Sequence, residues 1–397
     1  MTPRKVLFWI HLVTGLLAGI VIFVMAVTGV LLAYERQMVG SADRSVRVLP
    51  PVFTQHVPLS RLVPKLRDQQ GAMPMTVVMH HETDAPWLFT FGRSRTLFVN
   101  PYTGDVTGEA SPRFRAFFAT VEDIHRWLGG SGRARNAGRA VTGACNLLFL
   151  LLVCTGPFLW WPKEWTSARV RQVIFFRGGL SGRALFWNWH NVLGIWCAVP
   201  LLLIVATGVV MSYQWANDLL YRLTGNEPPR PQAFLVADNP GNRPGDRLHR
   251  PGEHSHEGLQ FDVLDRALER GAQQIPDWKT MTVRLPAVPS APMLVTLDVG
   301  NGGRPDQRTQ LTVSPQTGEI IRSEPFSSYN LGRRLRMWAR FTHTGETGGV
   351  LGQTIAAFAA AAASLLVVSG WVLALRRLFA WKKSSCHESE LAAQRAD

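Results

Sequence analysis

Four stretches without Asp, Glu, Lys or Arg constrain the fold of this chain more than any other feature. They cover residues 6–34, 140–162, 184–217 and 347–375. Each is longer than the roughly 20 residues that cross a hydrocarbon core of ~30 Å. We therefore expect an α-helical membrane protein with four transmembrane helices, at residues 6–34, 140–162, 184–214 and 347–375. The first stretch is too long for the apolar core of a signal peptide, so we expect it to be retained.

Positive charge is concentrated in the short segments beside these helices. The connection 163–183 has one acid, Glu164, and five cations, and the flanks of the first and last helices add Arg4, Lys5, Arg376, Arg377, Lys382 and Lys383. The positive-inside rule places these segments and both termini on the cytoplasmic side of the membrane. The formal net charge of +14 then reflects topology. We expect membrane lipid and no nucleic acid as a partner; a basic patch for an acidic partner is the alternative.

The chain repeats one plan in two halves. In "HLVTGLLAGIVIFVMAVTGVLLAY" and "HNVLGIWCAVPLLLIVATGVVMSY", Gly follows His by 4 residues, Thr-Gly by 17 and 18, and Tyr by 23. The outer segments share the turns "VNPYTGDV", from Val99, and "VSPQTGEI", from Val313, each after a β-prone stretch. We expect a strand-rich α+β module on the outer side of the membrane in each half, at residues 35–139 and 215–346. The cytoplasm would hold a loop at 163–183 and a tail at 376–397.

Each predicted helix also has one histidine near an end. His11 and His190 lie at equivalent positions near the cytoplasmic face and are called the inner pair; His125 and His343 precede the second and fourth helices and are called the outer pair. Aligned on the turn glycines, the outer histidines differ by four positions, which means one helical turn or an insertion with a compensating deletion. Two histidines at each face suit two haem groups, each with two axial imidazoles. The alternatives are interfacial histidines bonded to neighbours and, for the outer pair, surface histidines near the headgroups.

Several features around the histidines have two interpretations. Gly15, Gly19, Gly194 and the "AAFAAAAAS" run leave room for a cofactor or permit close helix packing. Arg4, Lys5 and Arg183 inside, and Arg126, Arg133 and Arg340 outside, could bind haem propionates or anchor the chain at the interface. Trp196, Phe23, Phe149 and Trp371 lie between the two levels and could assist electron transfer, although packing is their ordinary role.

Other motifs limit the chemistry. No C-x-x-C-H sequence occurs, so haem would bind non-covalently, as haem b. The chain has no G-x-G-x-x-G or Walker A pattern, and its cytoplasmic segments are too short to form a flavin or nicotinamide domain. Another molecule must therefore deliver the electrons. The segment "RLHRPGEHSH", with His249, His254 and His256, could bind a metal ion, but a solvated loop is the simpler interpretation.

The spaced His-x3-Gly and Thr-Gly helices, the two Pro-x-Thr-Gly turns and the histidines before the second and fourth helices resemble the PepSY-associated transmembrane family. Within that family the chain resembles the di-haem ferrisiderophore reductases. The resemblance implies two periplasmic PepSY-like modules and two b-type haems with His11, His190, His125 and His343 as axial iron ligands. It also implies that the chain reduces ferric siderophore in the periplasm and releases iron(II).

The electron donor under this interpretation is a flavin reductase, reduced flavin or membrane quinol, and no residue is assigned to catalysis. Two other functions stay open. The chain could bind a periplasmic ligand or protease with structural histidines, or it could be a siderophore permease. The permease is disfavoured because no predicted helix carries a charged residue in its middle to line a polar path.

Overall fold

A computed structural model describes residues 2–51, 55–92, 95–162, 164–229, 262–286 and 291–394, with side chains as far as Arg377. The histidine-rich segment with His249, His254 and His256 lies outside the described residues. The chain divides into two compact units. The first, the helical unit, contains residues 1–33, 121–216 and 342–397, and the second, the sheet unit, contains residues 34–120 and 217–341.

The helical unit contains three long apolar helices and one bent pair. The segments that are long and apolar enough to cross a membrane are Pro3–Asp43, Arg133–Trp160 and Glu346–Arg377. Within them lie α1 (Pro3–Leu32), α5 (Arg133–Trp160) and the first part of α13 (Gly349–Gln394). These three correspond to the first, second and fourth predicted helices. The described part of the chain therefore has three such helices, or four if the bent pair is counted as one span.

The third predicted helix is bent. It consists of α7 (Gly182–Trp196) and α8 (Ala198–Ser212), whose axes meet at 66° around Cys197. Pro200 explains the break, because proline has no N–H to give to the carbonyl of Trp196, four residues earlier, and its ring clashes with that carbonyl. The helix resumes at once, with the Leu201 N–H donating to the Cys197 carbonyl at 2.9 Å.

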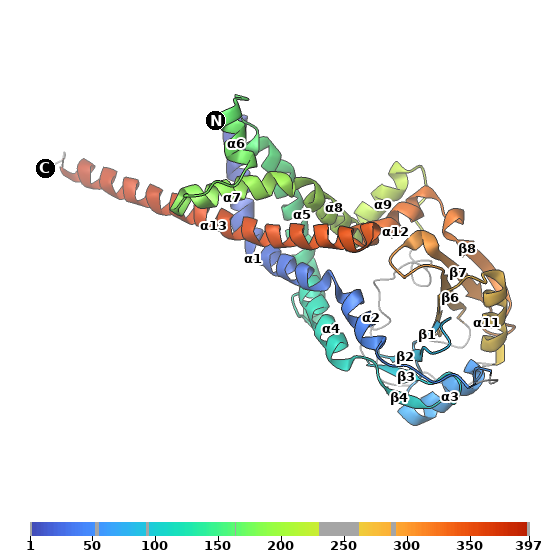
Figure 1. Cartoon of the computed structure of the whole chain (residues 1–397). Helices are drawn as coiled ribbons and strands as arrows, with labels where there is room; N and C mark the ends of the chain where they lie inside the picture. The colour runs from blue at the N-terminus through green and yellow to red at the C-terminus, as the bar shows by residue number, and fades with distance from the viewer. Residues whose placement is uncertain are drawn as a thin grey trace. The chain divides into compact units, whose positions relative to one another are not determined.

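Small residues bring the helices of this unit together. The helix α1 packs against α5 and α13, α7 packs against α13, and α5 packs against α8 (Figure 1). Ala359, Ala362 and Ala363 are buried against Ala26 of α1 and against α7 and α8. The Ala-rich run therefore serves close helix packing. Gly19 does the same, because the indole of Trp371 fills the space where its side chain would stand.

The sheet unit is built on one eight-stranded antiparallel sheet in the order β4-β3-β2-β1-β5-β6-β7-β8. Its strands are β1 (Thr76–His80), β2 (Trp87–Phe91), β3 (Arg95–Val99), β4 (Val106–Glu109), β5 (Thr280–Arg284), β6 (Met293–Asp298), β7 (Arg308–Val313) and β8 (Ile320–Pro325). Each outer segment contributes four consecutive strands, and β1 pairs with β5 from Thr76↔Arg284 to His80↔Thr280. The two expected modules thus share a sheet and a core.

Two equivalent helices cover one face of this sheet. They are α3 (Leu59–Gln70) and α11 (Asp262–Gln274) (Figure 1). Alternate strand residues point at them, as the buried Val77, Phe89, Val283 and Leu297 illustrate. The two Pro-x-Thr-Gly turns have the same backbone conformation. Gly104 and Gly318 both have φ of +70°, a value that favours glycine. A side chain there would also collide with α3 or α11.

The remaining elements are shorter. They are α2 (Glu35–Asp43), α4 (Pro112–Trp127), α6 (Ser167–Ile174), α9 (Gln214–Leu223) and α12 (Leu331–His343), with 3₁₀ helices at Pro305–Gln307, Phe326–Ser328 and Glu346–Gly348. The helix α6 belongs to the helical unit, whereas α4, α9 and α12 run across the sequence boundaries between the two units. The ends of α4 and α12 carry His125 and His343 into the helical unit.

The four-position offset between His125 and His343 arises before their helices begin. The segment from the turn glycine to the helix start is 104–112 in the first half and the longer 318–331 in the second. Each histidine lies in the last turn of its helix, so both hold nearly the same place there. The longer β8 and the 3₁₀ helix at Phe326–Ser328 accommodate the extra residues of the second half. The offset is therefore an insertion in the connection and leaves the histidines equivalent.

Candidate functional site

The four predicted histidines meet as two pairs inside the helical unit. His11 of α1 and His190 of α7 have ring centres 6.4 Å apart and ring planes at 83°. His125 of α4 and His343 of α12 have ring centres 6.4 Å apart and planes at 65°. The partners are those of the predicted inner and outer pairs, although their role as iron ligands stays a prediction.

The spacing of the rings in both pairs matches the distance between two imidazoles on opposite sides of one metal ion. A first-row metal binds an imidazole nitrogen at about 2 Å, and that nitrogen lies about 1 Å from its ring centre, so two opposed rings are held ~6 Å apart. An edge-to-face contact between aromatic rings covers about 4.5–7 Å and also includes the observed spacing. The hydrogen bonds of the rings show which nitrogen of each imidazole carries the proton and which nitrogen keeps a lone pair.

In the inner pair, each Nδ1 forms a hydrogen bond with a hydroxyl on a third helix, which carries neither histidine of the pair. His11 Nδ1 lies 2.8 Å from Thr155 Oγ1 of α5, and His190 Nδ1 lies 2.9 Å from Ser369 Oγ of α13. Both hydroxyls give their own proton to carbonyls of the preceding helical turn, at 2.8 Å and 3.1 Å. Each hydroxyl is therefore an acceptor for the ring, and the imidazole proton sits on Nδ1.

In the outer pair, the same tautomer follows from different partners. His125 Nδ1 lies 2.9 Å from Thr28 Oγ1, whose proton goes to the Val24 carbonyl at 2.7 Å. His343 Nδ1 lies 2.8 Å from the Ile204 carbonyl, which can only accept, while Thr207 Oγ1 is farther away at 3.5 Å. Burial lowers the pKa of His125 to about 4, and it also lowers that of His343. Both rings are therefore neutral at pH 7.

All four rings thus keep Nε2 as an unprotonated lone pair while Nδ1 is held by the protein. This is the usual arrangement of metal-binding histidines, whose second nitrogen donates to a fixed acceptor. Within the described residues there is no group of three or more His, Cys, Asp or Glu side chains that could hold a metal ion. Two imidazoles are too few for a structural zinc site. They are the full protein contribution to a haem, because the porphyrin supplies the four other nitrogens.

A glycine stands beside each imidazole. A Cβ at Gly156 would lie 4.0 Å from His11 Cε1, and one at Gly370 would lie 3.3 Å from His190 Cε1. A Cβ at Gly29 would lie 3.6 Å from His125 Cε1, and one at Gly208 would lie 3.3 Å from His343 Cε1. A side chain at position 370 or 208 would therefore crowd its imidazole, whereas a Cβ at position 156 or 29 would make an ordinary contact.

These contacts include residues that the sequence interpretation did not assign to the site. Each glycine follows a hydroxyl residue, giving Thr-Gly at 28–29, 155–156 and 207–208 and Ser-Gly at 369–370. Each dipeptide lies opposite a histidine from another segment. The recurrence of Thr/Ser-Gly near the end of every predicted helix is the sequence signal that could have identified Thr155 and Ser369.

The two pairs lie at opposite ends of α1. Thr28 marks the level of the outer pair, and it lies nearly five helical turns beyond His11 on the same helix. At ~1.5 Å per residue the separation along the axis is about 25 Å. Trp371 lies between these levels and donates its Nε1 proton to the Gly15 carbonyl at 3.1 Å. Its proposed part in electron transfer stays a prediction.

Two of the cations considered for propionates already have protein partners. Arg4 donates to the carbonyls of Leu159 and Trp161 at 2.8 and 2.9 Å, so it fixes the end of α5. Arg126 pairs with Glu122 at 3.1 Å and lies over the Trp127 ring. Both are anchored near a histidine pair, and neither contact prevents a further hydrogen bond from the guanidinium.

Comparison with known proteins identifies the family. A family model described as the PepSY-associated TM region matches residues 8–377, which include all four histidines and both turn motifs. A search of the curated proteins found no match. The family match covers most of the 397 residues, and the helical unit supplies several apolar helices long enough for a membrane. The chain is therefore a membrane protein of the PepSY-associated transmembrane family.

Proposed function

We propose that this chain is an inner-membrane electron-transfer protein with two non-covalent haem b groups, which reduces ferric siderophore in the periplasm. One observation supports this most strongly. Two imidazole pairs, each with a 6.4 Å ring spacing, keep every Nδ1 engaged and every Nε2 unprotonated. A merely structural histidine has no need for a second histidine at this spacing with the same nitrogen left free.

The chain's own groups suit haem at both sites. When bound, haem supplies an iron centre that takes and gives one electron. His11 with His190, and His125 with His343, would hold the two irons, and the hydroxyls of Thr155, Ser369 and Thr28 would fix the ring orientations. Because two imidazoles would hold each iron, oxygen and substrate would not bind to the metal directly. Such a site favours electron transfer over chemistry at the metal.

The choice of ferric siderophore rests on the family resemblance and on iron chemistry. Siderophores hold iron(III) through hard oxygen donors and hold iron(II) far less tightly, so one-electron reduction releases the metal. The outer pair lies where the chain passes from the helical unit to the sheet unit, at His125 and His343. We propose that substrate is reduced at the outer haem, by electron transfer through contact.

The reaction is tested with the chemically reduced protein. Mixed without oxygen with a ferric siderophore, it should reoxidise and give iron(II) that a ferrous chelator traps at one iron per electron. The matched variants are His125→Ala, which removes an outer ligand, and His81→Ala, which changes a histidine packed on Trp278 of the sheet unit. The first should stop the reaction and the second should not. Haem that stays reduced with excess substrate would contradict the proposed function.

The absorbance of the purified protein distinguishes this function from the alternative of a ligand- or protease-binding protein. A ligand- or protease-binding protein with structural histidines would purify colourless and would need no reducible Soret band. Absorbance before and after dithionite therefore distinguishes the two at once.

A further inference from the structure

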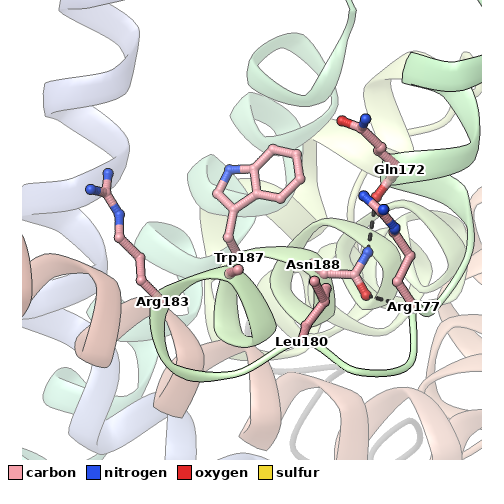
Figure 2. Close-up of a pocket in the computed structure, with 7 residues that line it drawn as sticks. Gln172, Arg177, Leu180, Arg183, Trp187 and Asn188 are labelled. Atoms are coloured by element: carbon pink, nitrogen blue, oxygen red, sulfur yellow. Dashed lines mark hydrogen bonds between the residues drawn. The ribbon is translucent and has the colours of Figure 1, made fainter.

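A cavity of about 380 Å³ lies between α6 and the first turns of α7, inside the helical unit (Figure 2). Its lining residues are Gln172, Arg177, Leu180, Arg183, Ala184, Trp187 and Asn188. Cavities of this size are typical of small-molecule sites. The segment belongs to the strongly basic connection that the positive-inside rule assigns to the cytoplasm. Of its lining residues, only Arg183 was considered above, as a cation for a haem propionate.

Asn188 keeps the walls of the cavity in place. It is 1% exposed, and its Nδ2 donates to the carbonyls of Gln172 and Phe175 at 2.9 and 3.1 Å. Its Oδ1 accepts from the Arg177 N–H at 3.1 Å, so one side chain ties the loop after α6 to α7 (Figure 2). The cavity is therefore preformed and does not depend on a ligand to order the loop.

The cavity is electropositive. Two of its seven lining residues are arginines and none is acidic. It also contains the first turn of α7, a 15-residue helix whose Ser181 makes no side-chain cap. Free N–H groups and the helix dipole attract anions there. A further cation is close, because Arg376 Nη1 lies 3.3 Å from where a Cβ of Gly182 would stand. A phosphate is the anion that several arginines and a helix N-terminus suit best.

Trp187 adds an aromatic surface beside these cations. Its indole is 43% exposed and stands between Arg183 and Arg177 (Figure 2). An aromatic ring of a ligand could stack on it. Trp187 also precedes His190 by three residues on α7, a rise of about 4.5 Å, so a molecule on the indole would be near the inner pair.

We propose that this cavity binds reduced flavin mononucleotide and is the place where electrons enter the chain. The proposal rests on the proposed function and specifies its donor. A flavin mononucleotide offers a phosphate for the arginines and a planar ring for Trp187. A quinol lacks the charge, and a phospholipid headgroup, which has the same phosphate chemistry, lacks the ring. Each reduced flavin would give two electrons, one to each of two ferric haems, and release its two protons to water as it leaves oxidised.

Binding is tested directly on the full-length chain in lipid nanodiscs. Oxidised flavin mononucleotide is titrated and its fluorescence, which stacking on Trp187 should quench, is followed. Riboflavin, which lacks the phosphate, is the second probe. In phosphatidylcholine discs the double variant Arg177→Gln/Arg183→Gln should weaken flavin mononucleotide binding at least tenfold and leave riboflavin nearly unchanged. Trp187→Leu should abolish the quenching with both probes, and Trp187→Phe should restore part of it.

Matched controls lie in the same connection but outside the cavity. Arg169→Gln removes a cation of α6 that pairs with Glu164, and Trp165→Leu removes an exposed indole that packs on Trp161. Both should bind flavin mononucleotide like the unchanged chain. Circular dichroism confirms that each variant is folded. Equal weakening by cavity and control variants would overturn the proposal, because it would indicate nonspecific charge attraction.

The lipid alternative is tested by adding phosphatidylglycerol to the discs. If the cavity is a headgroup site, flavin mononucleotide will fail to bind in discs that contain phosphatidylglycerol, which would overturn the proposal; binding that persists in those discs would support it. Failure of the flavin-site proposal can be distinguished from failure of the proposed function. Protein with two haems that does not bind flavin mononucleotide refutes the donor site alone. Protein that binds flavin mononucleotide but never contains haem refutes the proposed function and, with it, electron entry here.

Discussion

Replacing Thr28 and Thr207 by valine should have very different effects, although the two residues hold equivalent places in the repeat. Thr28 Oγ1 accepts from His125 Nδ1 at 2.9 Å, and valine has the same shape without the acceptor. Thr207 Oγ1 lies 3.5 Å from His343 Nδ1, which already donates to the Ile204 carbonyl at 2.8 Å. Thr28→Val therefore removes the closest acceptor of the His125 N–H and leaves it the Met25 carbonyl alone, whereas Thr207→Val leaves the closest acceptor of His343 in place.

The expected loss of haem affinity follows from the free energy of the hydrogen bond that Thr28→Val removes from His125. Loss of one of two hydrogen-bond acceptors costs about 0.5–1.5 kcal/mol, and ~1.4 kcal/mol is a factor of ten in an equilibrium constant. Loss of a bond that orients a metal-binding histidine lowers metal affinity by a similar factor, about 10–100-fold. We expect Thr28→Val to weaken haem binding at the outer pair by roughly tenfold and Thr207→Val by less than about threefold.

The assay uses a chain with only the outer site. In a His190→Ala background, each variant is loaded with haem and mixed with excess apomyoglobin, and the Soret change gives the rate of haem loss. Faster loss from Thr28→Val than from Thr207→Val supports the tautomer assignment. Equal loss from both, or no effect of Thr28→Val, would refute the argument that the Thr28 hydroxyl is the main acceptor for His125.

Three further predictions concern other parts of the chain. Gly370→Val should remove the inner haem and spare the outer one, because its Cβ would lie 3.3 Å from His190 Cε1. Absorbance would then show half the haem content of the unchanged chain, and loss of both haems would indicate misfolding. Asp265→Ala should destabilise the sheet unit by about 1–2 kcal/mol, because this carboxylate of α11 accepts from the Leu59 and Ser60 N–H groups at 2.7 and 3.2 Å and so caps α3. Thermal unfolding followed by circular dichroism measures it, with Arg266→Ala as a neutral control. NADPH alone should leave both haems oxidised while dithionite reduces both, and rapid reduction by NADPH would reveal a nucleotide site on this chain.

The histidine pairs could be predicted from the sequence because they repeat at matched spacing. His11 and His190 begin two similar helices, and spacing along an apolar helix translates directly into depth. The partners of the rings were harder to predict. Thr155 and Ser369 belong to helices whose similarity to each other is weak, and each contacts a histidine on another helix that is distant in the sequence.

Other features depend on contacts that local patterns do not encode. Pairing of β1 with β5 joins the first outer segment to the second, so the sequence predicted two modules where the structure has one sheet. The absence of charge between 184 and 217 predicted a continuous helix, because hydropathy does not register the missing N–H of Pro200. The turns at Gly104 and Gly318 were predictable, since a Pro-x-Thr-Gly motif requires a local conformation that glycine adopts easily.

Haem content of single and double ligand variants tests the central claim most directly. We predict two haems per chain in the pyridine haemochrome assay for the unchanged protein, one in His190→Ala, one in His125→Ala and none in the double variant. The remaining haem in each single variant should keep its absorbance spectrum. A protein expressed with ample haem that contains none, or a His190→Ala variant that still contains two, would contradict the account.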